Sequence, residues 1–81
     1  MAKREITMPR FGAQMQKGEI LSWNVKVGDH VEEDDELAEI KAEKMNASCD
    51  SLYEGTILEL VPVGTVVEVG GVIGYIDEEE D

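Results

Sequence analysis

The chain has 81 residues, with 19 acidic and 7 basic side chains and a formal net charge of −12. A chain of this length buries only about 60% of the surface that its unfolded form exposes, so we expect one small domain without a deep catalytic cleft. The negative charge repels phosphate backbones and anionic lipids, so nucleic acid and membrane surfaces are not expected as partners.

Short apolar or alternating segments, separated by Gly, Asp and Asn, predict β-strands throughout the chain and no helix. Besides strands, only a local turn over Gln14 to Lys17 is expected. In chain order the predicted strands are Glu5 to Met8, Gly18 to Asn24, His30 to Val31, Glu36 to Lys41, Asn46 to Cys49, Gly55 to Leu60, Val66 to Val67 and Val72 to Ile76.

An internal repeat is the most informative feature of the pattern. The segment GEILSWNVKVGDHVEEDDELAEI, which begins at Gly18, recurs from Gly55 as GTILELVPVGTVVEVGGVIGYI with one residue deleted. Two copies are too few for a stacked array, which needs at least about three. We therefore predict an all-β fold with pseudo-twofold symmetry, a flattened barrel or sandwich of two four-stranded antiparallel sheets. The candidates for its shared core are Val25, Val27, Val31, Val61, Val63 and Val67.

The repeat also predicts where the chain turns. Ile40 and Ile76 are equivalent in the two copies, so the segment after Ile40 must turn back to begin the second half. We predict a tight hairpin there, centred near Glu43 and Lys44 and away from the termini. A lysine at such a tip is a suitable acceptor for an amide-linked prosthetic group. From the residues alone, an ordinary solvated turn lysine remains the alternative.

Three single residues have simpler interpretations. Cys49, the only cysteine, is expected to be a small buried residue rather than a reactive thiol. Trp23 is expected to be a core-facing or half-buried strand residue. His30 has no second histidine with it, so no metal site is expected there.

The first half of the chain, ITMPRFGAQMQKGEILSWNVKVGDHVEEDDELAEI, contains Met-Pro, Gly-x-x-Met-x-x-Gly, a Trp in the second predicted strand and a Val-Gly-Asp turn. In one register, these features resemble the lipoyl domains of the acyltransferase (E2) components of 2-oxo-acid dehydrogenase complexes. The resemblance extends from Ile6 to about Ile76. We expect the domain at residues 4–77, and residues 78–81 as an acidic tail or the start of a linker. The whole closing run DEEED is expected to be disordered.

The resemblance implies that lipoic acid is attached to Lys44 as an amide. Glu43 and Met45 would then be recognised by a lipoate ligase or lipoyl transferase. The loaded arm would swing between the E1 decarboxylase, the E2 acyltransferase site and the E3 dihydrolipoamide dehydrogenase, while the protein contributes tethering. No acyltransferase His-x-x-x-Asp-Gly signature, nucleophile elbow or phosphate loop occurs, so we expect a non-catalytic, monomeric carrier domain.

The resemblance also implies that the loop after the first strand recognises E1 and lies beside the hairpin. Phe11 and Met15 are its main candidates, with core packing beneath the loop as the alternative for both. Gly12 and Gly18 are expected to serve backbone geometry. The whole predicted recognition loop consists of Phe11, Gly12, Ala13, Gln14, Met15, Gln16 and Lys17.

Two alternatives on the same fold remain open. Lipoyl domains usually carry Asp-Lys-Ala and biotin carrier domains Met-Lys-Met, whereas this chain reads Glu43-Lys44-Met45. Lys44 could therefore carry biotin in a biotin-dependent carboxylase, or the chain could be an unmodified binding module. No signal or transit sequence precedes Glu5, so the expected compartment is the prokaryotic cytoplasm rather than the mitochondrial matrix.

Overall fold

A computed structural model describes residues 2–42 and 44–79, and within these ranges the fold consists of eight strands. Each of the eight predicted strands is confirmed, with ends shifted by a few residues. The described part of the chain has no helix that could span a membrane. The strands are β1 (Ala2–Thr7), β2 (Lys17–Trp23), β3 (His30–Val31), β4 (Glu36–Ala42), β5 (Met45–Asp50), β6 (Gly55–Leu60), β7 (Val66–Glu68) and β8 (Val72–Glu78).

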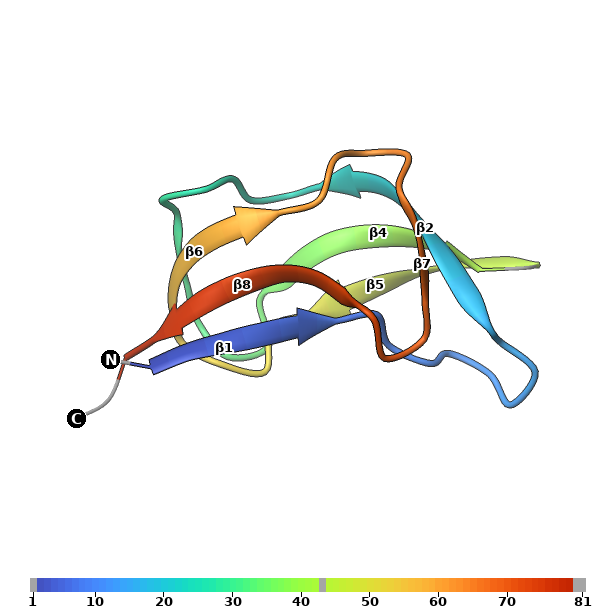
Figure 1. The fold of residues 1–81 in the computed structure, drawn as a ribbon, viewed down its shortest axis with the longest axis horizontal. Coiled ribbons are helices and arrows are strands. Elements are labelled where there is room, and N and C mark those ends of the chain that lie inside the picture. The colour runs from blue at the N-terminus through green and yellow to red at the C-terminus, as the bar shows by residue number, and fades with distance from the viewer. Residues whose placement is uncertain (1, 43, 80–81) are drawn as a thin grey trace.

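The strands form two four-stranded antiparallel sheets, in the orders β1-β8-β6-β3 and β5-β4-β2-β7. The body measures 39 × 22 × 17 Å along its principal axes, which is the shape of a flattened barrel. In Figure 1 the N- and C-termini lie at one end of the long axis, and the β4–β5 hairpin protrudes at the other. The predicted fold class is confirmed.

The internal twofold symmetry extends to details of the backbone. Exchanging β1, β8, β6 and β3 for β5, β4, β2 and β7 converts one sheet order into the other. Equivalent bulges leave Leu21 of β2 and Leu58 of β6 without a register partner. The equivalent turn glycines Gly28 and Gly64 have φ angles of 96° and 92°, which side chains other than that of glycine rarely allow. Each repeat copy therefore folds in the same way.

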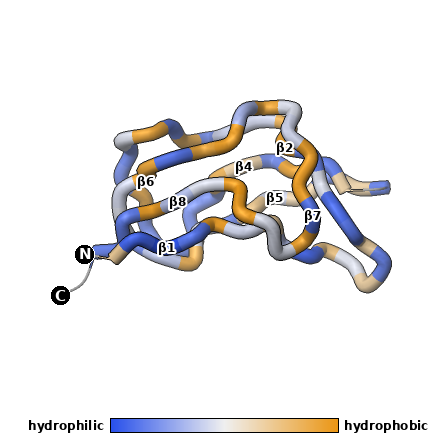
Figure 2. The backbone as a smooth tube through the Cα atoms, in the orientation of Figure 1, coloured by the Kyte–Doolittle hydropathy of each residue, from blue (hydrophilic) through white to orange (hydrophobic). Residues whose placement is uncertain are grey.

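The centre of the core consists of paired isoleucines from the two sheets. Ile20 pairs with Ile40 in one sheet, and the equivalent Ile57 pairs with Ile76 in the other; none is more than 1% exposed. Figure 2 shows apolar stretches interspersed with polar ones on most strands, as expected when a strand has one buried face. The buried apolar residues are Ile6, Met8, Met15, Ile20, Val31, Leu37, Ala38, Ile40, Ala42, Cys49, Ile57, Ile73 and Ile76.

The prediction that Val27 and Val63 belong to the core is wrong, because they are 61% and 60% exposed. Each immediately precedes a positive-φ glycine, Gly28 or Gly64, in a turn, so its side chain faces solvent. The other predicted core valines are buried or pack against the core: Val25, Val31, Val61 and Val67.

Cys49 and Trp23 behave as predicted. Cys49 is only 4% exposed, and burial, assisted by the neighbouring Asp50 carboxylate, raises the pKa of its thiol to about 11. Trp23 is half-buried, and its Nε1 donates a hydrogen bond to the carbonyl oxygen of Val61 at 2.8 Å. This bond joins the first repeat copy to the second.

The acidic C-terminal run begins within the fold. Strand β8 pairs with both β1 and β6 as far as Glu78, and the Glu79 amide donates to the Glu54 carbonyl oxygen at 2.8 Å. The prediction of disorder for the whole run is therefore wrong for Asp77 to Glu79, because strand pairing continues there. Residues 80 and 81 lie outside the described residues.

Candidate functional site

The β4–β5 hairpin presents Lys44 at its tip. The last paired residues of the two strands are Ala42 and Met45, so the connection consists of residues 43 and 44 alone. The predicted tight hairpin is confirmed. Lys44 is exposed and, within the described ranges, has no hydrogen-bond or ion-pair partner. Glu43 lies outside the described residues.

The base of the hairpin is anchored in the barrel. Ile40 and Ala42 on β4 are 0% and 6% exposed, so alternate positions of this strand pack into the core. Pairing of Ile40 with Ala47 and of Lys41 with Asn46 continues the ladder to the tip. The hairpin thus holds the Lys44 amine in solvent on a rigid support, without an obligatory turn glycine.

The loop that follows β1 is folded tightly against the body. The Met15 amide donates to the Gly12 carbonyl oxygen at 3.1 Å, which places the local turn slightly before the predicted Gln14 to Lys17. The Arg10 guanidinium donates two further bonds, each of 3.0 Å, to the carbonyl oxygens of Ala13 and Met15. Arg10 is not predicted from the sequence, because its role depends on backbone carbonyl groups that no motif reveals.

Phe11 and Met15 pack beneath this loop. Met15 is 5% exposed and belongs to the core, while Phe11 is half-buried against it. The alternative of core packing, which the sequence left open for both, therefore describes their positions. The exposed side of the loop is formed by Gly12, Ala13, Gln14, Gln16 and Lys17.

An open groove of about 480 Å³ joins the loop to the hairpin. Its walls include Lys17 from one side and Lys41 with Ala42 from the other. Gly18 makes this approach possible, since a Cβ there would lie 2.7 Å from Cγ2 of Ile40. The loop therefore lies beside the base of the hairpin, and two lysines border the groove in an otherwise acidic protein.

A two-sheet barrel that holds an exposed lysine at the tip of a two-residue hairpin has the architecture of a domain that carries a prosthetic group on an arm. The sequence profile of the biotin and lipoyl attachment family, described as "Biotin-requiring enzyme", matches residues 4–76. The chain belongs to this family.

Proteins similar to this chain include E2 components. The dihydrolipoyllysine-residue acetyltransferase components of the pyruvate dehydrogenase complexes of Staphylococcus epidermidis and Staphylococcus aureus are each 45% identical over 74 residues. The match covers 90% of this chain but only 17% of the length of those relatives.

A solved structure gives the same indication. The solution structure of the lipoyl domain of the 2-oxoglutarate dehydrogenase complex from Azotobacter vinelandii superposes with a TM-score of 0.73 at 26% identity. The superposition covers 94% of this chain and 98% of that domain. The chain is thus similar over nearly its whole length to a complete lipoyl domain.

Proposed function

We propose that Lys44 carries lipoic acid as an amide, and that the chain acts as the swinging-arm carrier domain of an E2 component. The observation that carries this proposal is the position of Lys44, which is exposed, unpartnered among the described residues and held at the tip of a two-residue hairpin. An enzyme that forms the amide needs an accessible amine in a reproducible place, and the anchored hairpin supplies both. The lysine stem also lets the attached group reach outward.

Lipoic acid is favoured over biotin by the region around the first loop. In the Gly-x-x-Met-x-x-Gly segment, Gly12 accepts the turn hydrogen bond, Met15 fills the core and Gly18 admits Ile40. Each residue of this lipoyl-type motif therefore has a structural role here. The names of the similar E2 components and of the similar solved domain also refer to lipoyl groups.

When attached, the dithiolane ring supplies the acyl-transfer and redox chemistry, and the chain's own residues supply position. The barrel keeps the arm attached to the complex, which raises its effective concentration at each active site. The proposed partners are a lipoate ligase or lipoyl transferase, the E1 decarboxylase, the E2 catalytic core and the E3 dihydrolipoamide dehydrogenase. The relatives are bacterial, and we propose the bacterial cytoplasm as the compartment.

Two surfaces are proposed for recognition. Met45 is 50% exposed beside Lys44, so it and Glu43 are proposed to be read by the attaching enzyme. For E1, the exposed side of the first loop is proposed as the contact, with Phe11 and Met15 shaping it from below. The folded unit, predicted as residues 4–77, extends in the structure from Ala2 to the paired Glu78, and we propose that an acidic linker follows it.

Intact-mass measurement tests the attachment directly. The chain is expressed with a lipoate ligase and lipoate or, separately, with a biotin ligase and biotin. We expect a lipoyl mass gain for the wild type and for Lys41→Arg, an exposed lysine of the same hairpin, and no gain for Lys44→Arg. A mass gain seen only with the biotin ligase would mean that the group carried by Lys44 is biotin and not lipoic acid. No gain under either condition would leave an unmodified binding module.

A further inference from the structure

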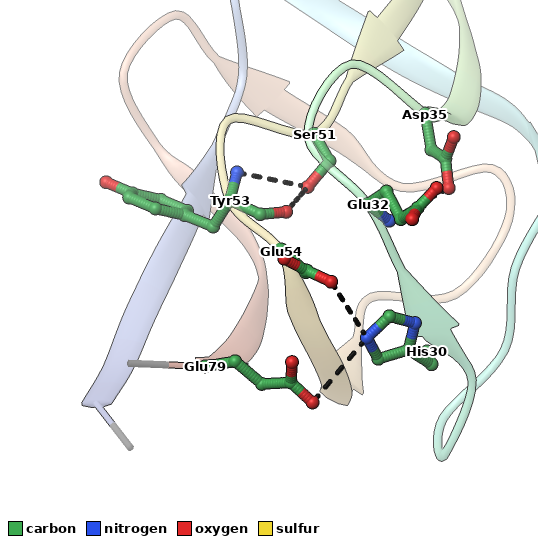
Figure 3. A network of polar contacts seen from close by, with 7 residues as sticks. All are labelled: His30, Glu32, Asp35, Ser51, Tyr53, Glu54 and Glu79. Atoms are coloured by element: carbon green, nitrogen blue, oxygen red, sulfur yellow. Dashed lines mark hydrogen bonds and ion pairs between the residues drawn. The ribbon is translucent and has the colours of Figure 1, made fainter. Parts of the chain in front are cut away.

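A second group of polar side chains converges at the end of the barrel where the chain termini lie (Figure 1). His30 of β3, Glu54 just before β6 and Glu79 just after β8 point toward one another in Figure 3. Nε2 of His30 lies 3.6 Å from Oε2 of Glu54 and 3.6 Å from Oε1 of Glu79. All three side chains are about half exposed, so ions in solution reach them freely.

The backbone holds the three segments together before any ion arrives. Strand β3 pairs with β6 at His30 and Thr56, and the Glu79 amide donates to the Glu54 carbonyl oxygen at 2.8 Å. The turn leading into Glu54 is also pinned, since the buried Ser51 hydroxyl donates to the Tyr53 carbonyl oxygen at 2.6 Å (Figure 3). Little backbone entropy therefore has to be lost for the three side chains to act together.

The spacing of the donor atoms suits a metal ion. The imidazole nitrogen and one oxygen of each carboxylate lie within 4.8 Å of one another. Zn²⁺ binds such atoms at about 2.0–2.2 Å, which places neighbouring ligands of a tetrahedral ion roughly 3.4 Å apart. The two distances of 3.6 Å from His30 already approach this separation.

The donor types select the class of ion. Ca²⁺ and Mg²⁺ prefer complete shells of oxygen, whereas an imidazole nitrogen with two carboxylates suits a divalent transition-metal ion. The net charge of −12 adds a long-range attraction for cations, although this attraction does not discriminate between metals.

We propose that His30, Glu54 and Glu79 form an open, three-ligand site for a divalent transition-metal ion such as Zn²⁺. The ion ties the end of β8 to β3 and to the start of β6, at the point where the chain leaves the barrel. This departs from the sequence-based expectation of no metal site, which rested on the absence of a second histidine. Carboxylates from two distant segments take the place of that histidine.

A titration with Zn²⁺ alone tests the site. The chain is produced without lipoate, because a reduced dithiol at Lys44 would itself bind Zn²⁺. His30 is the only histidine, so its imidazole NMR signals report on one place. We expect a saturable shift of these signals with one-to-one calorimetric stoichiometry, and an increase in Tm on binding.

Variants separate the site from general attraction to an acidic protein. His30→Gln and, independently, Glu79→Gln are expected to raise the Kd for Zn²⁺ by roughly tenfold or more. Glu33→Gln removes an exposed turn carboxylate outside the cluster and is expected to leave the Kd unchanged. An equal shift with Mg²⁺, unchanged Zn²⁺ affinity in His30→Gln, or no saturation at millimolar Zn²⁺ would overturn the proposal. The cluster would then be a set of polar contacts between His30 and the two glutamates that binds no metal.

Discussion

The two ends of the barrel are built from equivalent strands but differ in what those strands display. At one end β4 and β5 are joined through residues 43 and 44; at the other, the equivalent β8 and β1 lie beside the chain termini (Figure 1). His30 pairs with Thr56 at the terminal end, and its repeat equivalent Val66 pairs with Glu19 at the hairpin end. The backbone is therefore repeated in the two halves, whereas the side chains at equivalent positions differ in chemical type.

Equivalent positions therefore show where side chains of different chemistry lie on a common scaffold. Val66 and Lys17 line the groove beside the hairpin, while their repeat equivalents His30 and Glu54 belong to the proposed metal site. Substitutions at paired positions can separate the requirements of the fold from those of the two sites.

The largest expected effect comes from moving the amine by one residue. Lys44→Met combined with Met45→Lys transfers the lysine from the turn into β5, where residue 45 pairs with Ala42. Successive strand residues point to opposite faces, so the amine leaves the tip of the hairpin. We expect lipoylation, measured by intact mass, to be lost while the circular dichroism spectrum is unchanged. Full loading of the exchanged chain would show that position at the tip is not required.

The equivalent glycines Gly18 and Gly55 are expected to differ in tolerance. A Cβ on Gly55 would overlap the backbone carbonyl of Asp77, whereas one on Gly18 meets the side chains of Ile40 and Met8. Backbone cannot yield as readily as flexible side chains, so we expect Gly55→Ala to lower the free energy of unfolding by about 3 kcal/mol and Gly18→Ala by about 1 kcal/mol.

Urea unfolding of both variants checks this difference. Gly12→Ala is a suitable control, because a Cβ there would meet nothing within 4 Å. Equal losses in the free energy of unfolding for Gly18→Ala and Gly55→Ala would mean that the two repeat copies tolerate a Cβ equally at this position.

Cys49 on β5 occupies the position that Ile6 takes on the equivalent β1, so a thiol replaces a hydrocarbon there. The folded thiol has a pKa of about 11 against an ordinary 9.0, and the unfolded state therefore ionises first as pH rises. The contribution of the protonated Cys49 thiol to the free energy of unfolding is fully present below pH 9 and is lost between pH 9 and 11. The slope reaches at most about 1.4 kcal/mol per pH unit.

The measurement is unfolding stability against pH for the wild type and Cys49→Ala. Subtracting one curve from the other removes the titration of lysines and tyrosines common to both. A difference that stays constant from neutral pH to pH 11 would contradict the burial of this thiol.

The smallest expected effect concerns the bond between the halves. Trp23 donates to the Val61 carbonyl oxygen, whereas its repeat equivalent Leu60 has no donor to offer. Trp23→Phe removes the donor and is expected to lower the free energy of unfolding by about 1 kcal/mol. Tyr75→Phe, which deletes a hydroxyl without a hydrogen bond among the described residues, is expected to change it by less than about 0.5 kcal/mol. Thermal or urea unfolding measures the stability of both variants. Equal losses for Trp23→Phe and Tyr75→Phe would mean that the hydrogen bond from Trp23 to Val61 does not stabilise the fold.

The strands and the symmetry were predictable because their signals are local. Alternation of apolar residues marks the buried face of a strand, and Gly28 and Gly64 mark equivalent turns. Local alternation failed at Val27 and Val63, which lie in turns and are exposed rather than on the buried face of a strand. The extent of β8 was also missed, because its acidic end is held by partners on β1 and β6 rather than by its own composition.

The sequence by itself determined the eight strands, their division into two like halves and the exposed turn that carries Lys44. Only the tertiary structure decided that Met15 is buried, that Lys17 and Lys41 share a groove, and that His30 meets two glutamates. The reason is physical: periodicity along a chain specifies which face of a strand is buried. The side chains that meet across the barrel depend instead on register and packing between segments far apart in sequence.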